Sequence, residues 1–444
     1  MSDSNRPKII AIDDDPTGSQ TVHSCLLLLK WDVATLVQGL LDDAPIFFIL
    51  ANTRALTPAD AERTTRQVCR NLKQALIQTN TQEYLVVSRS DSTLRGHYPL
   101  ETDVIAAELG PFDAHFMVPA FFEAGRITLD STHYIEADGV RTPVHKTEFA
   151  KDSVFGYSHS YLPDYVAEKT GEKIAADQVE RLTLDVLQSG TKDRLGELYN
   201  NVCVAVDAGQ QNDLDRFSQE LLMAAAQGKK FLFRSAASLL TSLAALPPQP
   251  VAASDMARYT RGHNPGVILV GSHVKKTTRQ LEYLLQQPGV AGLEVNAVRL
   301  KENPDQASTM VADILTQVQT VYDQGQTAVV YTSRQELTFA DATRRLAFGE
   351  AISNVLMDIV RGLPADLGFL ISKGGITSND TLSNGLALTS ARLLGQVIPG
   401  VSVVTTAADH PRFPNLPVVL FPGNVGGDDA VAAAYRRMAQ LQDP

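Results

Sequence analysis

Short apolar runs that end in polar turns recur along the first half of the chain. Such runs, bounded by turn residues, are typical of buried strands. Helix signals lie between them, and the clearest is Thr57 followed by Pro58, which predicts a helix that begins there and continues to about Gln78. Strands that alternate with helices predict an α/β fold. The apolar runs are 8–12, 24–30, 45–50, 84–87, 115–119, 201–206 and 230–233.

A second pattern of the same kind begins at Val267, after a Pro-rich stretch. We therefore predict two α/β domains with largely parallel sheets flanked by helices, and an active site in the cleft between them. The N-terminal domain is predicted over 1–245, a linker over 246–265 and the C-terminal domain over 266–444. The strands expected in the second domain are 267–270, 328–331, 367–371 and 418–421, and the helices are 275–285, 342–361 and one from about 430.

Composition narrows the classes of partner. The formal net charge is −11, which argues against non-specific binding to nucleic acid or to an anionic membrane. The three Cys have no metal-ligand spacing, residues 1–8 lack the apolar core of a signal peptide, and no apolar run is long enough to span a bilayer. We expect a cytoplasmic protein that acts on a small molecule, either as a single chain or as a homodimer.

Three adjacent carboxylates, Asp13, Asp14 and Asp15, follow the first apolar run. The carboxyl ends of strands are where open α/β sheets bind ligands. Like charges so close together destabilise the fold unless a cation, a proton or a substrate hydroxyl offsets them. This turn is the first candidate site, and the alternative is a solvated turn that caps the next element.

Arginine side chains follow three other apolar runs, as Arg54, as Arg89 and Arg95, and as Arg126. Guanidinium groups beside hydroxyls and free backbone N–H groups form anion sites, and a guanidinium binds a carboxylate at two points. If the strands are parallel neighbours, these groups converge on one edge of the sheet. The alternative is a helix cap with surface arginines. We expect 130–160 to be irregular and polar, either a functional loop or a small subdomain.

Glycine-rich turns between strands and helices mark the second domain, at 271–272, 374–378 and 423–427. Glycine lets backbone N–H groups approach phosphates, although none of these turns is a Walker A loop or a dinucleotide fingerprint. Ordinary turn glycines are the alternative. An acceptor site on one domain and a phosphate site on the other suit a kinase.

The motifs as a set resemble the four-carbon acid sugar kinase family over nearly the whole chain. The family's Asp-Asp-x-Thr-Gly turn matches 14–18, Asp-Ser-Thr-Leu-Arg-Gly is intact at 91–96, and Pro-Ala-Phe-x-x-x-Gly-Arg matches 119–126. Its Gly-Ser, Gly-Gly-x-Thr-Ser and Gly-Asn-x-Gly segments match 271–272, 374–378 and 423–426. The resemblance implies ATP and Mg²⁺ as cofactors, and a threonate-, erythronate- or 2-oxo-tetronate-like acid as the acceptor.

The positions of these residues at the strand ends, together with the resemblance, predict their roles. Asp14 and Asp15 would be catalytic, with Asp15 as the base and the other carboxylate orienting the hydroxyl or helping to hold Mg²⁺. The acid sugar would contact Thr17, Arg54, Arg89, Asp91, Ser92, Arg95 and Arg126. The nucleotide would contact Ser272, Gly374, Gly375, Ile376, Thr377, Gly423, Asn424 and Gly426.

Five positions depart from the family pattern, so the acceptor and the details of nucleotide binding stay open. They are Pro16, Arg89, His97, Phe122 and Ile376, the last in place of a Glu.

Two other functions stay open. A haloacid-dehalogenase-type phosphatase would use Asp13 as nucleophile and Asp15 as acid and base, with Lys373 and either Asp428 or Asp429 as later motifs. A non-catalytic protein that binds sugar acids is the second. The sequence does not define metal ligands.

Overall fold

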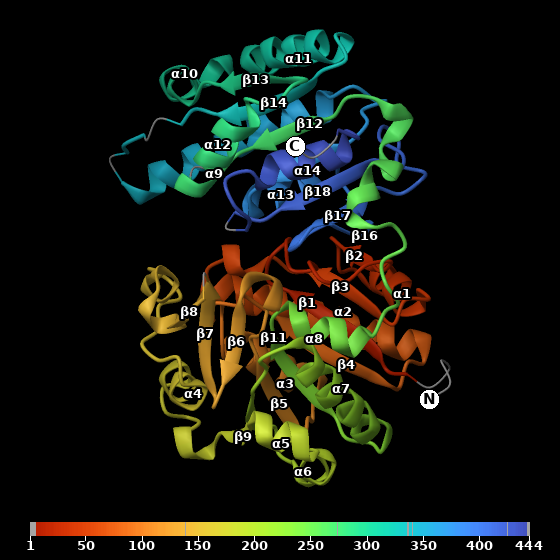
Figure 1. Ribbon diagram of the computed structural model, residues 1–444, viewed down its shortest axis with the longest axis vertical. Coiled ribbons are helices and arrows are strands. Elements are labelled where there is room, and N and C mark those ends of the chain that lie inside the picture. The colour runs from red at the N-terminus through yellow and green to blue at the C-terminus, as the bar shows by residue number, and fades with distance from the viewer. Residues whose placement is uncertain are drawn as a thin grey trace. The chain divides into compact units, whose positions relative to one another are not determined.

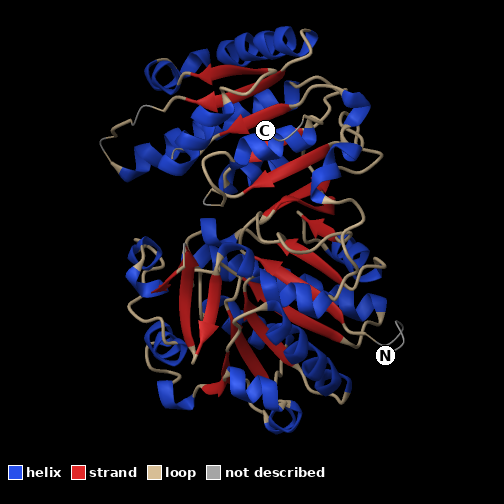
Figure 2. Ribbon diagram, in the orientation of Figure 1, coloured by secondary structure: helices blue, strands red, loops and turns tan. Residues whose placement is uncertain are grey.

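The chain forms two compact units, Met1–Pro248 and Gln249–Pro444, shown in Figures 1 and 2. The structure is a computed structural model that describes residues 6–137, 139–272, 274–334, 337–339, 341–423 and 425–441, with only the backbone of 342 and 343. The segment predicted as a linker contains the 3₁₀ helix η7 (Ala253–Tyr259), and its Met256 is fully buried in the core of the second unit. The predicted domain limits remain predictions.

The first unit is built on a parallel sheet with the strand order β2-β3-β1-β4-β11-β5-β10-β9. This confirms the α/β class and the largely parallel sheet. The strands are β1 (Lys8–Asp13), β2 (Leu26–Leu28), β3 (Ile46–Leu50), β4 (Tyr84–Arg89), β5 (Ala114–Val118), β9 (Glu180–Leu182), β10 (Val202–Val206) and β11 (Phe231–Ser235). The helices are α1 (Val33–Leu41), α2 (Pro58–Thr79), α3 (Leu100–Leu109), α4 (Leu162–Thr170), α5 (Leu184–Ser189), α6 (Lys192–Glu197), α7 (Gln211–Ala226) and α8 (Ala237–Ala244).

Helices cover both faces of this sheet because side chains alternate along each strand. Leu232 of β11 belongs to the core beneath α1, α2 and α3. Its neighbour Phe233 faces the other way and stacks on Phe116 of β5, whose ring meets Phe217 of α7 at 5.4 Å. The long helix α2 begins as predicted, with the Thr57 hydroxyl accepting from the backbone N–H of Asp60.

The strand register aligns the carboxyl ends of the central strands. Asp13 of β1 lies opposite Leu50 of β3 and Arg89 of β4. Arg89 lies opposite Ser235 of β11, which lies opposite Val118 of β5. The loops that follow these strands therefore leave the sheet from one edge, as the sequence predicted for β1, β4 and β5. Strand β11 lies between β4 and β5, an order that the sequence did not reveal.

The expectation of an irregular segment at 130–160 was wrong for its first part. Strands β6 (Arg126–Leu129), β7 (Thr132–Ala137) and β8 (Val140–Pro143) form a separate antiparallel sheet. Most side chains of β7 and β8 are half-buried or exposed, so the segment lacks the strong apolar alternation that predicts a strand. The predicted strand at 24–30 is also shorter in the structure, where it is β2.

The second unit has the strand order β13-β14-β12-β15-β18-β17-β16, with only β17 and β16 antiparallel to their neighbours. No helix in the described ranges has the length and apolar character needed to cross a membrane. The strands are β12 (Val267–Val270), β13 (Val290–Val295), β14 (Thr327–Thr332), β15 (Leu370–Lys373), β16 (Ser390–Ile398), β17 (Val401–Thr405) and β18 (Pro417–Phe421). The helices are α9 (Lys275–Leu284), α10 (Ala297–Glu302), α11 (Ala307–Asp323), α12 (Ala342–Gly362), α13 (Gly375–Asp380) and α14 (Ala430–Met438).

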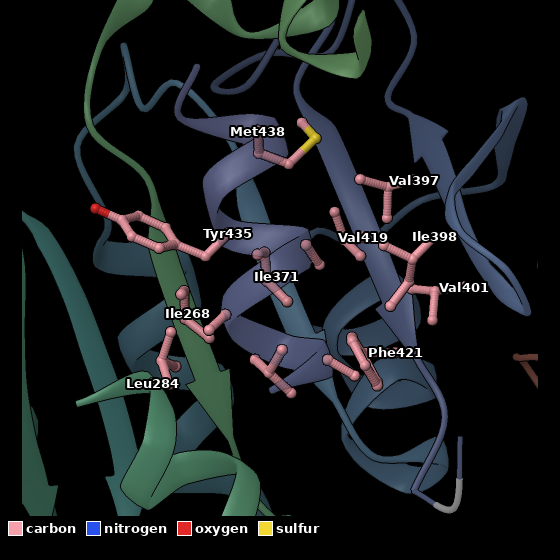
Figure 3. Close-up of a cluster of buried hydrophobic side chains, with 14 of the residues drawn as sticks. Ile268, Leu284, Ile371, Val397, Ile398, Val401, Val419, Phe421, Tyr435 and Met438 are labelled. Atoms are coloured by element: carbon pink, nitrogen blue, oxygen red, sulfur yellow. The ribbon is translucent and has the colours of Figure 1, made fainter. Parts of the chain in front are cut away.

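An apolar core beneath α9 and α14 holds the second sheet together (Figure 3). Here too the register aligns the strand ends, because Val270 lies opposite Tyr331 and Lys373, and Lys373 lies opposite Phe421. The glycine turns after β12, β15 and β18 therefore leave from one edge. Strand β15 begins and ends later than the predicted 367–371, so Lys373 belongs to the strand and not to the turn.

Candidate functional site

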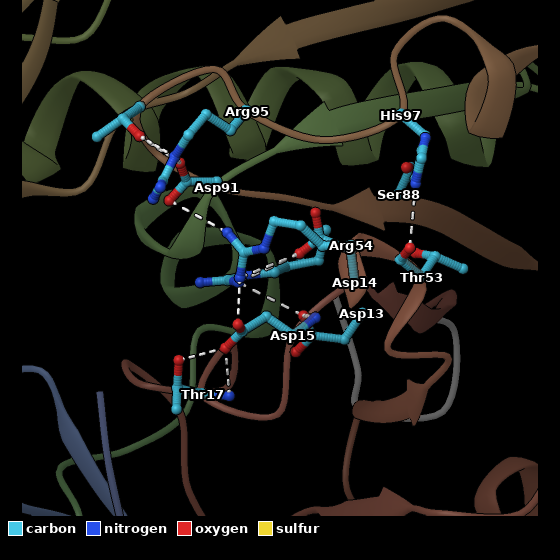
Figure 4. A network of polar contacts seen from close by, with 12 residues as sticks. Asp13, Asp14, Asp15, Thr17, Thr53, Arg54, Ser88, Asp91, Arg95 and His97 are labelled. Atoms are coloured by element: carbon cyan, nitrogen blue, oxygen red, sulfur yellow. Dashed lines mark hydrogen bonds and ion pairs between the residues drawn. The ribbon is translucent and has the colours of Figure 1, made fainter. Parts of the chain in front are cut away.

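The acidic turn, Arg54 and Arg95 lie in one network of polar contacts, shown in Figure 4. Arg54, in the short 3₁₀ turn after β3, is its centre. Its guanidinium pairs with Asp15, approaches Asp91 to 3.3 Å and Asp14 to 3.8 Å. One cation thus binds the loop after β1 to the loop after β4. The convergence predicted from the sequence is present for these loops.

Asp13 is sealed inside the turn. It is 1% exposed, and its Oδ1 lies 3.4 Å from the guanidinium of Arg89. A Cβ at Gly18 would lie 2.0 Å from its Oδ2, so only glycine fits there. Burial raises the pKa of Asp13 to about 8, against the attraction of Arg89, and the carboxyl is therefore neutral at pH 7.

Asp14 and Asp15 have different surroundings. Asp14 is buried, and neither of its oxygens has a hydrogen-bond partner among the described residues. Burial raises its pKa to about 6, although Arg54 opposes the change. Asp15 accepts from the backbone N–H of Thr17 at 2.8 Å and from the Thr17 hydroxyl, and its side chain is 19% exposed. Burial raises the pKa of Asp15, but Arg54 and Thr17 outweigh burial and the net pKa is lowered. Asp15 is therefore the ionised and accessible carboxylate of the three.

The segment 91–96 carries the second half of the network. Asp91 accepts from the Arg95 Nε at 2.8 Å and from the Thr93 hydroxyl. Burial raises the pKa of Asp91, but Arg54 and Arg95 together hold it well below its usual range. The Arg95 guanidinium also lies 3.9 Å from Asp152.

Two further charged residues, Glu101 and Arg234, lie at this edge and were not predicted. Arg234 of β11 pairs with Glu101 of α3 and donates to the Ser88 hydroxyl at 2.9 Å. Glu101 also accepts from the Thr53 hydroxyl at 2.5 Å, which anchors the turn that carries Arg54. Arg234 ends an apolar run, so the rule that found the other arginines could have found it. No local sequence pattern in α3 would have identified Glu101 as a residue of this site.

Two predicted substrate residues lie outside direct contact with the network. Ser92 is buried, and its carbonyl accepts from His133 at 2.8 Å. Arg126 donates to the carbonyl of Ala124, and its Nε has no partner in the described part of the chain. Burial lowers the pKa of Arg126, which Asp91 partly offsets, so Arg126 lies within electrostatic range of the segment.

The glycine turns of the second unit surround a cavity of about 320 Å³. Residues from the turns after β12, β15 and β18 meet an apolar face of α12, which the sequence did not reveal. Asp380, at the end of α13, is the carboxylate among the lining residues, and it accepts from the hydroxyl of Ser353. The predicted lining residues are Ser272, Gly374, Gly375, Ile376, Thr377 and Gly423, and those from α12 include Ile352, Ser353, Leu356 and Met357.

Three side chains, of which Lys373 and Gln280 are fully buried and Arg334 is half-buried, fix the turns around this cavity. Arg334 donates to the carbonyl of Ser272 at 2.7 Å. Lys373 donates to the carbonyl of Pro422 at 2.5 Å, and burial lowers the pKa of this lysine to about 7. Gln280 donates to two carbonyls of the last glycine turn, those of residues 425 and 427, at 3.1 and 2.8 Å. Hydrogen bonds from these side chains to backbone carbonyls therefore hold the turns in place.

Among the described residues, the predicted nucleotide residue Gly426 does not line the cavity. Gly426 has φ +79°, and a Cβ there would lie 2.3 Å from the Cβ of Ala430, so close packing on α14 explains this glycine. Asn424 lies outside the described residues. Ile376, which stands where the family has Glu, is 71% exposed at the cavity.

Two family models match the chain. A sugar-binding N-terminal domain matches residues 9–243, and a nucleotide-binding C-terminal domain matches residues 267–431. The chain belongs to the four-carbon acid sugar kinase family. The sequence-based resemblance is thus confirmed.

Individual relatives are distant. A D-erythronate kinase from Heliobacterium modesticaldum is 23% identical over 455 residues, which cover 95% of each chain. A Salmonella typhimurium protein named as a proposed tRNA synthase has a TM-score of 0.70 at 18% identity, over 97% of this chain and 98% of that one. A Haemophilus influenzae protein of family DUF1537 has a TM-score of 0.63 at 17% identity, over 97% and 100%. At these identities the solved structures show the shared fold.

Proposed function

We propose that the protein is an ATP-dependent kinase that phosphorylates a hydroxyl of a four-carbon aldonate or a related oxo-acid. The observation that carries the proposal is Asp15, an accessible and ionised carboxylate held by Arg54 and Thr17 at the sheet edge. The kinship to a D-erythronate kinase and the two domain models support the same reaction class.

The first unit would bind the acceptor. Asp15 would accept a hydrogen bond from the acceptor hydroxyl and take its proton late in a loose transition state. The hydroxyl oxygen attacks the γ-phosphorus, the bond from that phosphorus to the β–γ bridging oxygen breaks, and ADP leaves. Arg95 would bind the carboxylate of the acceptor, because a guanidinium recognises a carboxylate at two points. Asp14 would help to orient the hydroxyl and would hold Arg54 in place.

The second unit would bind the nucleotide in its cavity. The glycine turns after β12, β15 and β18 would place backbone N–H groups near the phosphates. The apolar α12 residues, among them Leu356 and Met357, would contact the base.

Mg²⁺ fits this arrangement as an ion carried by the nucleotide. Among the described residues no group of three or more His, Cys, Asp or Glu side chains could hold a metal ion by itself. Mg²⁺ in kinases is bound mainly by phosphates, waters and one or two carboxylates. Asp380 is the carboxylate at the cavity that would contact it. Bound there, the ion would neutralise charge on the β- and γ-phosphates.

The phosphatase alternative requires Asp13 as an accessible nucleophile. Asp13 is instead 1% exposed, packs against Gly18 and has a pKa of about 8. A neutral, enclosed carboxyl cannot attack a phosphate ester. The burial of Asp13 therefore supports the kinase over the phosphatase.

A coupled assay for ADP release, run with ATP, Mg²⁺ and a panel of four- to six-carbon aldonic and oxo-acids, tests the proposal. We expect acceptor-dependent ADP release with at least one four-carbon acid. Failure of every acid on the panel to raise ADP release above the acceptor-free rate would refute it.

A further inference from the structure

Three buried side chains of the region after β6 donate hydrogen bonds to the backbone of the segment 91–96. His133 donates to the carbonyl of Ser92 at 2.8 Å, Tyr157 to that of Thr93 at 2.6 Å, and Tyr165 to that of Leu94 at 2.8 Å. We call His133, Tyr157 and Tyr165 the clamp. Three consecutive carbonyls are thus drawn toward one side by residues from β7, from the loop before α4 and from α4.

The clamp is itself rigid. The rings of Tyr157 and Tyr165 meet edge to face at 5.5 Å. His133 is fully buried, and burial lowers its pKa to about 4, so it is neutral at pH 7. Because a carbonyl only accepts, the proton lies on Nε2, and Nδ1 accepts from the Thr128 hydroxyl at 2.9 Å. One tautomer satisfies both contacts.

Drawing the carbonyls to one side turns N–H groups to the other. In a trans peptide the carbonyl of one residue and the N–H of the next point in opposite directions. The N–H groups of Thr93, Leu94 and Arg95 therefore face away from the clamp. That of Leu94 donates to the carbonyl of Asp91 at 3.2 Å, whereas those of Thr93 and Arg95 have no acceptor among the described residues.

An unpaired N–H in a buried segment is costly unless a ligand accepts it. Thr93 is 1% exposed, and Leu94 beside it has φ +65°, a left-handed conformation rare for leucine. The hydrogen bonds from the clamp offset the free-energy cost of this left-handed backbone conformation. The segment also carries Arg95, whose Nε pairs with Asp91, and Arg126, with an unpaired Nε, lies within electrostatic range of Asp91, so two guanidinium groups lie in this region together with the Asp91 carboxylate.

We propose that the clamp positions the N–H groups of Thr93 and Arg95 to bind the carboxylate of the acceptor. The inference rests on the proposed function, because it concerns the acceptor end of that site. It makes the three clamp side chains positioning residues, which act through the backbone of 92–95. It also assigns the acid group of the substrate, and not its hydroxyls, as the group that the segment selects.

The test compares Tyr165→Phe and Tyr157→Phe with wild type, and uses Tyr199→Phe, at an exposed tyrosine, as the matched control. Each enzyme is assayed with the best acid of the panel and with the amide of that acid. We expect the acceptor KM of the clamp variants to rise about tenfold while the nucleotide KM stays unchanged, because hydrogen bonds to a charged group are lost. We also expect the preference for the acid over its amide to shrink in the clamp variants and to persist in Tyr199→Phe.

An unchanged acceptor KM, or equal losses for the acid and the amide, would overturn the inference while leaving the kinase intact. Absence of acceptor-dependent ADP release in the wild type would instead refute the proposed function. If Tyr165→Phe does not fold, Tyr157→Phe decides the question by the same comparison, since its hydroxyl bonds the neighbouring carbonyl.

Discussion

Asp13→Asn should stabilise the first unit, and the gain should grow with pH. In the folded protein burial raises the pKa of Asp13 to about 8, from an ordinary 3.8. Between these values the folded chain keeps the proton and the unfolded chain releases it, so this group lowers the stability of the wild type as pH rises. An asparagine does not titrate and resembles the protonated acid in shape.

The size of the effect follows from the same two pKa values. For each pH unit between them, the free energy of unfolding of the wild type falls by about 1.4 kcal/mol relative to that of the variant. From about pH 5 to about pH 7 the difference in unfolding free energy should therefore grow by about 2.7 kcal/mol.

Urea unfolding followed by tryptophan fluorescence measures this difference. Trp31 is the sole tryptophan, and it packs against the core beneath α1 and α2, so it reports on the first unit. A difference that stays flat between the two pH values would mean that Asp13 is ionised in the folded protein, and the reasoning would fail. Acceptor-dependent ADP release should persist in Asp13→Asn, whereas the phosphatase alternative predicts that this variant no longer releases phosphate from the phosphorylated acid.

Four further variants test the two sites. Asp15→Asn should lower kcat by about 10²- to 10⁴-fold in the coupled assay with little change in the nucleotide KM; a kcat near wild type would exclude Asp15 as the base. The acceptor kcat/KM of the wild type should fall as pH drops through about 6, because protonated Asp14 no longer attracts Arg54, and in Asp14→Asn that inflection should be absent. Arg95→Lys should raise the acceptor KM about tenfold, and a change confined to the nucleotide KM would contradict the assignment. Gly374→Ala should raise the nucleotide KM alone, since the residue has φ +115° and its Cβ would lie 3.2 Å from that of Ser272; equal ATP affinity would count against the cavity.

Local patterns predicted the elements that position both sites. The apolar runs of β1, β3, β4 and β5 and the cap at Thr57 are encoded by adjacent residues, and so are the polar turns at the strand ends. The order of strands across the sheet is not local. It places Arg54 beside the acidic turn and Arg234 beside Glu101, and that second pair joins residues 133 positions apart in the chain.

The sequence favoured Asp15 as the base by position alone and gave no physical difference between the three adjacent aspartates. Their identities are equal, but Asp13 and Asp14 are enclosed and Asp15 is accessible. Burial and neighbouring charges, both properties of the folded chain, separate their pKa values. The clamp was missed for the same reason, because Tyr157 and Tyr165 read as ordinary tyrosines in the sequence and act only through the carbonyls that they meet in space.

The most direct test of the proposed kinase identifies the product. The protein is mixed with ATP, Mg²⁺ and the best four-carbon acid, and ³¹P NMR follows the phosphorus. We predict that ADP and a phosphate monoester of the acid accumulate in equal amounts, and that neither forms without the acid. Release of inorganic phosphate without the monoester, or hydrolysis of the phosphorylated acid in the absence of nucleotide, would contradict the account.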